Sequence, residues 1–146
     1  LKQGDDDASR LLASFREDIG SVLFATDSFW QGVDVPGASL SQVIIAKLPF
    51  SVPNDPVFTA RSEAVVKRGG SPFMELSVPE AVIKFRQGFG RLIRRNDDSG
   101  CVALLDKRIY EKRYGTIFLG SIPESKRLYK DLDTIVSETE RFLFDS

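Results

Sequence analysis

Three short, unbroken apolar runs constrain the fold of this chain more than any other feature of its sequence. They are Ser21–Thr26, Gln42–Leu48 and Cys101–Leu105. Uninterrupted apolar strands belong to sheets that are covered on both faces, whereas half-exposed strands alternate apolar and polar residues. Because segments with helical spacing separate these runs, the sequence predicts an α/β fold with a mainly parallel sheet.

Capping residues and turn residues locate the predicted helices. Apolar spacing predicts a first helix around Leu11–Ile19, with Asp6 or Asp7 as its N-cap and Gly20 marking its end. Prolines at first helical positions and a glycine pair after a last turn mark the others. These further helices are predicted from the turn at 53–56 to about 67, at about 79–95 and at about 124–144.

Composition excludes several classes of function. The chain has no histidine and a single cysteine, Cys101, which excludes Ser-His-Asp catalysis, Cys-His catalysis, an internal disulfide and most zinc chemistry. One cysteine in an apolar run is typical of a reducing setting, so we expect the cytoplasm. No apolar run approaches the roughly 18 residues of a membrane span, so no membrane partner is expected.

Length and charge bound the organisation of the chain. Its 146 residues fit one domain, residues 1–146, which we expect to be monomeric. The formal net charge of −1 gives no global basic surface, so any contact with nucleic acid must be local. The chain begins at Leu1 rather than Met, which we interpret as a domain cut from a longer protein and truncated at its N-terminal edge.

The predicted long helix carries one polar and one apolar stripe. At about 100° per residue, five polar residues fall within roughly 60° of one another. These are Glu80, Lys84, Gln87, Arg91 and Arg94. The apolar residues gather on the opposite side: Val82, Phe85, Phe89, Leu92 and Ile93. Gly90 lies beside the polar stripe, where a missing side chain permits the close approach of a ligand or another backbone.

Two arginines one helical turn apart suit a polyphosphate. A guanidinium group stays charged and binds phosphate oxygens with a bidentate fork. The alternative is a solvated helix end whose arginines interact with the helix dipole. Gly88 and Gly90 favour a packing or functional reason, because each costs a helix about 1 kcal/mol relative to alanine.

The segment Gln87-Gly88-Phe89-Gly90-Arg91-Leu92-Ile93-Arg94 resembles motif VI of superfamily 2 helicases, in the form found in DinG and XPD relatives. Upstream, residues 25–37 resemble motif V of the same family, whose core is Phe-Trp-x-Gly-Val-Asp-x-Pro-Gly. The connector Lys47–Pro56, the step Pro79–Val82 and the pair Tyr114-Gly115 are also similar to this family. The resemblance extends over about residues 20 to 125, in consistent order.

The motif V segment leaves the end of a predicted strand, where open α/β sheets place ligand sites. Thr26 and Ser28 offer hydroxyls to a DNA backbone, and Asp34 could accept a hydrogen bond from a ribose hydroxyl. For Trp30 there are two interpretations, a core ring beneath the loop or a platform for base stacking, and we favour the first.

The resemblance implies a RecA-like, three-layer fold that acts as the second motor domain of a DinG-type DNA helicase, with roles for particular residues. Arg94 matches the arginine finger, and Arg91 matches its companion on the phosphates. Gln87 and Gly90 match positions that contact ATP. Two further matches, Gly32 and Asp34 of motif V, couple ATP to DNA.

The resemblance also implies partners: single-stranded DNA, and a first RecA-like domain of the same protein that would bind most of the ATP and Mg²⁺. No Gly-x-x-x-x-Gly-Lys-Ser/Thr sequence occurs among the 146 residues, so we expect no ATP hydrolysis by this chain alone. An iron–sulfur cluster, found in some relatives, would belong to the other half. The alternative function is a non-catalytic RecA-like module that docks protein or single-stranded DNA.

Overall fold

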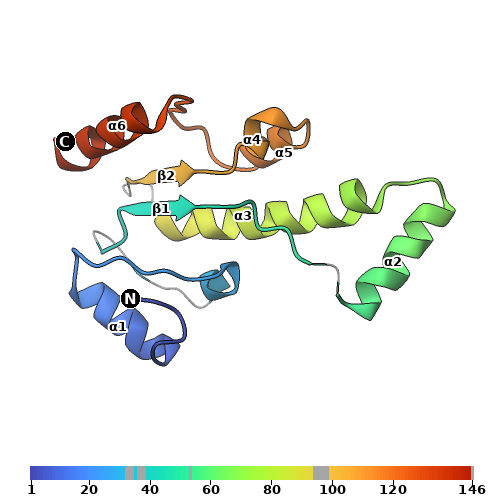
Figure 1. Ribbon diagram of the computed structural model, residues 1–146, viewed down its shortest axis with the longest axis horizontal. Helices are drawn as coiled ribbons and strands as arrows, with labels where there is room; N and C mark the ends of the chain where they lie inside the picture. Colours follow the sequence, from blue (N-terminus) through green and yellow to red (C-terminus); the bar gives the residue numbers. More distant parts are fainter. Residues whose placement is uncertain (32–34, 36–38, 53, 94–98, 146) are drawn as a thin grey trace. The chain divides into compact units, whose positions relative to one another are not determined.

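The computed structural model describes residues 1–31, 35, 39–52, 54–93 and 99–145. In chain order its elements are α1 (Ala8–Glu17), a 3₁₀-helix (Asp27–Gln31), β1 (Gln42–Ile45), α2 (Pro56–Lys67), a π-helix (Phe73–Ser77), α3 (Val78–Leu92), β2 (Cys101–Leu104), α4 (Arg108–Glu111), α5 (Gly115–Gly120) and α6 (Leu132–Phe144) (Figure 1). The chain divides into two compact units. Unit 1 comprises residues 1–44, 87–103 and 123–146, and unit 2 comprises residues 45–86 and 104–122.

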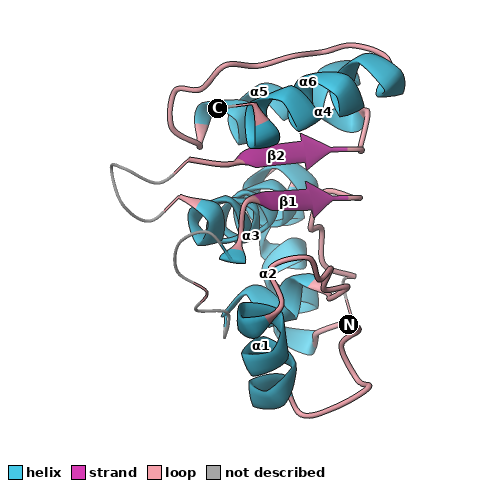
Figure 2. Ribbon diagram, turned by 90° about the vertical axis from the view of Figure 1, so that its left-hand side faces the viewer, coloured by secondary structure: helices cyan, strands magenta, loops and turns pink. Residues whose placement is uncertain are grey.

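The described sheet consists of β1 and β2, which pair directly. The Cys101 N–H donates to the Ser41 carbonyl at 3.0 Å, and the Leu105 N–H donates to the Ile45 carbonyl at 3.0 Å. Donors and acceptors advance together along the chain, so the strands are parallel, as both views show (Figures 1 and 2). The predicted α/β class with parallel pairing is confirmed, although each strand ends earlier than predicted.

The predicted strand at Ser21–Thr26 is reduced to one bridge. Phe24 forms an isolated parallel bridge with Lys2. The Gln3 N–H donates to the Phe24 carbonyl at 2.8 Å, and the Phe24 N–H donates to the Leu1 carbonyl at 2.9 Å. The only partner described for this run is the short segment at Lys2, and a run of apolar residues forms a strand only where a neighbouring segment pairs with it along its length.

Full burial of the strands was also predicted, and within the described residues it does not hold. The Ile44 side chain in β1 is 58% exposed, and all four residues of β2 are only partly buried. The unbroken apolar runs therefore indicate strands correctly but overstate how much of each strand this chain covers.

Unit 1 has a small apolar core beside α1. Phe15, Phe29 and Val35 are buried, and three partly buried leucines pack against them. α1 begins where the Asp7 side chain accepts a hydrogen bond from the Ser9 N–H at 2.8 Å, which confirms Asp7 as the N-cap. The core thus holds the segment around the 3₁₀-helix against the first helix.

The C-terminal helix is shorter than predicted. α6 begins at Leu132 rather than near Glu124, because Asp131 caps it by accepting from the Thr134 N–H at 2.9 Å. Residues 124–130 are exposed and carry no regular structure. α6 lies alongside β2, where Thr139 Oγ1 is 3.6 Å from Cys101 Sγ (Figure 2).

Aromatic rings form the core of unit 2. Phe85 and Phe118 are fully buried, with ring centroids 5.5 Å apart in an edge-to-face arrangement. Phe50 stacks on Phe73 at 5.4 Å and meets the Tyr114 ring edge-on at 5.6 Å. Each such pair contributes about 0.5–1.5 kcal/mol beyond area burial, so this cluster connects the segment after β1 to α3 and α5.

The buried side of α3 agrees only in part with the predicted one, since Phe85 and Leu92 are buried as predicted. Its buried residues are Val78, Ala81, Phe85, Gly88 and Leu92, spaced three and four apart. Val82, Phe89 and Ile93, which were predicted to be core, are only partly buried.

Among the described residues, no helix combines the length and apolar character needed to cross a membrane.

Candidate functional site

The two predicted DNA-contacting residues, Thr26 and Ser28, lie next to each other at the start of the 3₁₀-helix of unit 1. Their side chains are exposed, and Thr26 Oγ1 is 2.8 Å from Ser28 Oγ. Gln3 reaches them from 23 residues away. Its Oε1 atom accepts from the Thr26 backbone N–H at 2.9 Å and from the Thr26 hydroxyl at 2.9 Å. The hydroxyl pair is therefore already hydrogen-bonded within the chain.

Trp30 connects the motif V segment to the motif VI helix. A Cβ atom added to Gly88 would lie 2.8 Å from Trp30 Cζ3 and 2.9 Å from Trp30 Cε3. Real Cβ atoms do not approach ring carbons so closely, so only glycine fits beneath this ring. The packing interpretation of Trp30 is the one that the structure supports, since the ring lies on the α3 backbone.

The predicted ATP-contacting residues of α3 occupy its last turn and a half. Gln87 and Gly90 are exposed, and a Cβ added to Gly90 would meet nothing within 4 Å. Arg91 is partly buried, and its Nε atom is shielded from solvent. The described residues therefore leave open space at Gly90, while Arg91 is less exposed than a solvated stripe would require.

Three predicted site residues lie outside the described residues. They are Gly32 and Asp34 of motif V and Arg94 of motif VI. The structure brings together Thr26, Ser28 and Gln3, and it brings Trp30 onto Gly88. The predicted roles of all eight site residues stay predictions.

Asp106 is a residue that the sequence interpretation missed. Its Oδ2 atom accepts from the Leu48 N–H at 2.9 Å, and Arg108 binds the same carboxylate with Nε at 2.9 Å and a terminal nitrogen at 2.6 Å. The Arg108 guanidinium also lies 5.4 Å from the centre of the Phe50 ring, within cation–π range. The hydrogen bond from Arg108, together with that from Leu48, lowers the pKa of Asp106 to about 2 against the effect of burial. Asp106 is therefore ionised at any physiological pH.

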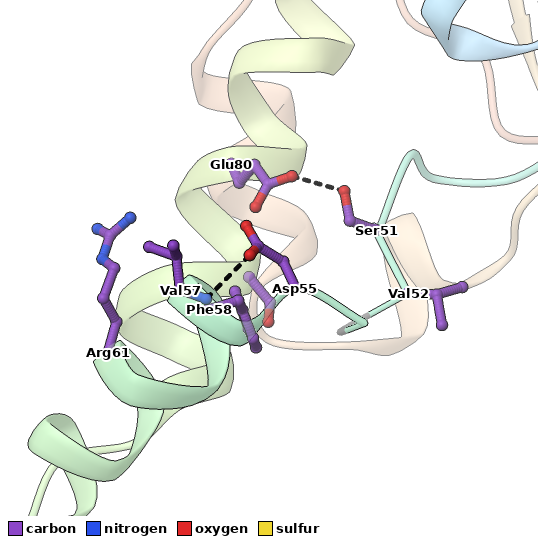
Figure 3. Close-up of a pocket in the computed structure, with 8 residues that line it drawn as sticks. Ser51, Val52, Asp55, Val57, Phe58, Arg61 and Glu80 are labelled. Carbon is purple, nitrogen blue, oxygen red and sulfur yellow. Dashed lines mark hydrogen bonds between the residues drawn. The ribbon is translucent and has the colours of Figure 1, made fainter.

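Unit 2 also contains a cavity of about 290 Å³ that the sequence did not indicate (Figure 3). Ser51 and Glu80 in its wall are hydrogen-bonded to each other. Ser51 Oγ donates to Glu80 Oε1 at 2.5 Å, and Lys84 Nζ donates to Ser51 Oγ at 2.6 Å. Asp55 caps α2 by accepting from the Val57 N–H at 2.9 Å. The wall holds two carboxylates, Asp55 and Glu80, against one cation, Arg61, so its charge does not favour a polyphosphate.

The α/β fold agrees with what the two motif-bearing segments predict. Residues 1–125 match the family model described as "Helicase C-terminal domain". This match covers most of the chain, so the chain belongs to the helicase C-terminal domain family. The predicted resemblance to DinG-type helicases is confirmed, and the fold is the RecA-like α/β fold of such a domain.

Several curated proteins are similar to this chain. It is 47% identical over 136 residues to the "ATP-dependent DNA helicase YoaA" of Haemophilus influenzae, covering 93% of this chain and 21% of that protein. It is 49% identical over 123 residues to the "ATP-dependent helicase DinG" of Mycobacterium tuberculosis, which is 84% of this chain and 18% of that protein. It is 43% identical over 114 residues to the "3'-5' exonuclease DinG" of Bacillus subtilis, which is 78% of this chain and 12% of that protein. The chain thus spans about a fifth or less of these relatives' lengths.

Proposed function

We propose that this chain is the second motor domain of an ATP-dependent DNA helicase of the DinG type, acting in DNA repair or replication in the bacterial cytoplasm or nucleoid. The observation that carries the proposal is the family match over residues 1–125, which contains both helicase motifs in order. Relatives that bear the names YoaA and DinG, and are called ATP-dependent helicases, support it. The partner would be a first RecA-like domain that holds ATP and Mg²⁺.

On the nucleotide side, the proposed roles fall on the last turns of α3. Arg94 is the arginine finger, which stabilises charge on the transferred phosphoryl group, and Arg91 binds the same phosphates. Gln87 and Gly90 contact the nucleotide or the neighbouring domain. Both residues are exposed, and a Cβ atom added to Gly90 would meet no described atom within 4 Å, which supports this role.

On the DNA side, Thr26 and Ser28 contact the backbone of single-stranded DNA, and Gly32 and Asp34 couple the nucleotide to it. The packing of Trp30 on Gly88 supports such coupling. Trp30 follows Ser28 by two residues, and Gly88 directly follows Gln87, so a shift of either segment would act on the other. ATP binding and release would then move the protein along the strand.

The arginine finger is tested in the full-length protein. Arg94→Ala should lower the rate of DNA-stimulated ATP hydrolysis by about 10³-fold or more while nucleotide affinity stays nearly unchanged, since the finger stabilises the transition state. Arg94→Lys should remain impaired because lysine lacks the bidentate fork. Arg86→Ala, at an exposed position of the same helix, is the matched control and should hydrolyse ATP normally.

Two other results would redirect the proposal. Loss of nucleotide binding with hydrolysis retained would remove Arg94 from the finger role. Unchanged hydrolysis in both Arg94 variants, or no hydrolysis by the wild-type protein, would favour the alternative, a docking module for protein or single-stranded DNA.

A further inference from the structure

Both hydroxyl protons of the Thr26–Ser28 pair are committed within the chain. The Thr26 backbone N–H donates to Gln3 Oε1, which identifies that atom as the carboxamide oxygen, an acceptor. Thr26 Oγ1 lies 2.9 Å from the same oxygen, so its only proton must point there. Ser28 Oγ, 2.8 Å from Thr26 Oγ1, must then donate to it. The Thr26 N–H, the Thr26 hydroxyl and the Ser28 hydroxyl thus each donate to an acceptor within the chain.

A phosphate oxygen would compete for the same donors. It is an acceptor, as Gln3 Oε1 is, but it is charged, and charge-assisted hydrogen bonds are roughly twice as strong as neutral ones. The Thr26 amide and hydroxyl converge on one oxygen, which is the arrangement that binds an anionic oxygen. A phosphate oxygen bound by both Thr26 donors would therefore have to take the place of Gln3 Oε1.

The Gln3 side chain can leave without disturbing the local fold. Its backbone N–H is held separately, by donation to the Phe24 carbonyl at 2.8 Å. The hydrogen bonds of its carboxamide lie at the exposed surface, so water can replace Thr26 as a partner at small cost.

We propose that Gln3 competes with DNA for these donors: its carboxamide oxygen holds the Thr26 amide and hydroxyl until a DNA phosphate displaces it. This inference rests on the proposed function, in which Thr26 and Ser28 contact DNA. It adds a residue that lies outside both helicase motifs and that determines when their donors become available.

Two substitutions at Gln3 in the full-length protein test the inference. Gln3→Glu keeps an acceptor on both donors but adds a negative charge, so affinity for a labelled single-stranded oligothymidine should fall by roughly tenfold. Gln3→Ala removes the competitor and leaves the backbone pairing, so affinity should stay equal or rise. Dissociation constants are measured without nucleotide, at two salt concentrations, because phosphate contacts weaken with salt.

Ala8→Glu, at the exposed start of α1, is the control for added charge and should bind like the wild type. A merely structural role for Gln3 predicts the opposite pattern, with Gln3→Ala weakened and Gln3→Glu unchanged, and that result overturns the inference. Normal binding by both Gln3 variants overturns the inference too. That outcome leaves the proposed function untouched, because the Arg94 variants test it separately by ATP hydrolysis. A wild-type protein that does not bind the oligonucleotide overturns both. If Gln3→Ala does not fold, Gln3→Glu decides alone.

Discussion

At the scale of single residues, Asp106 joins two segments that lie far apart in the sequence. One carboxylate accepts hydrogen bonds from the backbone N–H of Leu48, 58 residues away, and from the backbone and side chain of Arg108. The Asp106 side chain is 9% exposed, so these bonds are little screened by water. The pair therefore holds the end of the β1 segment to the residues after β2, within unit 2.

Asp106→Asn should destabilise the fold in a pH-dependent way. The folded-state pKa of about 2 lies below the ordinary value of 3.8, so the ionised carboxylate contributes about 2 kcal/mol to the free energy of unfolding. That contribution is present above about pH 4 and is lost as the pH falls toward 2. Urea unfolding of both proteins at neutral pH and near pH 3 should show a difference that shrinks in acid.

Asp5→Asn, at an exposed turn position, is the matched control and should leave stability unchanged. A loss of stability for Asp106→Asn that is the same at both pH values would show that its ionisation is not the source. The sequence placed Asp106 after a predicted strand but gave no sign of its partner. One of its hydrogen-bond donors is the backbone N–H of Leu48, which comes near Asp106 only in the folded chain.

At the scale of elements, α3 has two glycines with opposite surroundings. Gly88 lies beneath the Trp30 ring, whereas a Cβ atom added to Gly90 would meet none of the described residues within 4 Å. The sequence identified both as costly in a helix but could not separate their reasons. Glycine at position 88 is required by close packing, and glycine at position 90 is not required by anything in the described chain.

Gly88→Ala and Gly90→Ala should therefore change stability in opposite directions. The added methyl group at position 88 collides with Trp30, and overpacking of this kind costs about 1–3 kcal/mol, partly offset by alanine's better helix propensity. At position 90 the same methyl should stabilise α3 by up to about 1 kcal/mol. Thermal unfolding of the two variants measures the difference.

Trp30→Leu tests whether a collision with the Trp30 ring is the reason that Gly88→Ala loses stability. Combined with Gly88→Ala, the smaller side chain should relieve the collision, so the double variant should lose less stability than the two single losses summed. Additive losses would mean that Gly88 and Trp30 do not interact. Equal melting temperatures for Gly88→Ala and Gly90→Ala would contradict the close approach itself.

At the scale of the whole molecule, the chain holds half of the proposed ATPase machinery. It contains the arginine-bearing motif VI but no phosphate-binding lysine loop among its 146 residues. An arginine finger accelerates hydrolysis only of a nucleotide that other groups already hold with its metal ion. The three relatives are about four to seven times as long as this chain, which leaves room for a domain of that kind in each of them.

The 146-residue chain alone should therefore bind ATP weakly and hydrolyse none of it. Phosphate release from the purified chain should equal that of a blank with or without oligothymidine, whereas the full-length protein should turn over ATP. Chain prepared with Arg91→Ala is the control for trace contamination, because contaminating activity would be the same in both preparations. Turnover that disappears in the Arg91→Ala chain would contradict the need for a second domain.

The sequence alone determined the α/β class and the helicase family, and it narrowed the cap of α1 to Asp6 or Asp7, because these depend on local periodicity, capping chemistry and short motifs. It overstated the strand at Ser21–Thr26 and the length of α6, since strand pairing and helix ends depend on partners elsewhere.

Only the tertiary structure placed Gln3 on Thr26, Trp30 on Gly88 and Asp106 on Leu48. Each of these contacts joins residues more than 20 positions apart. Sequence periodicity indicates which residues share a face of a helix, but neither how deeply each is buried nor which distant group will meet it there.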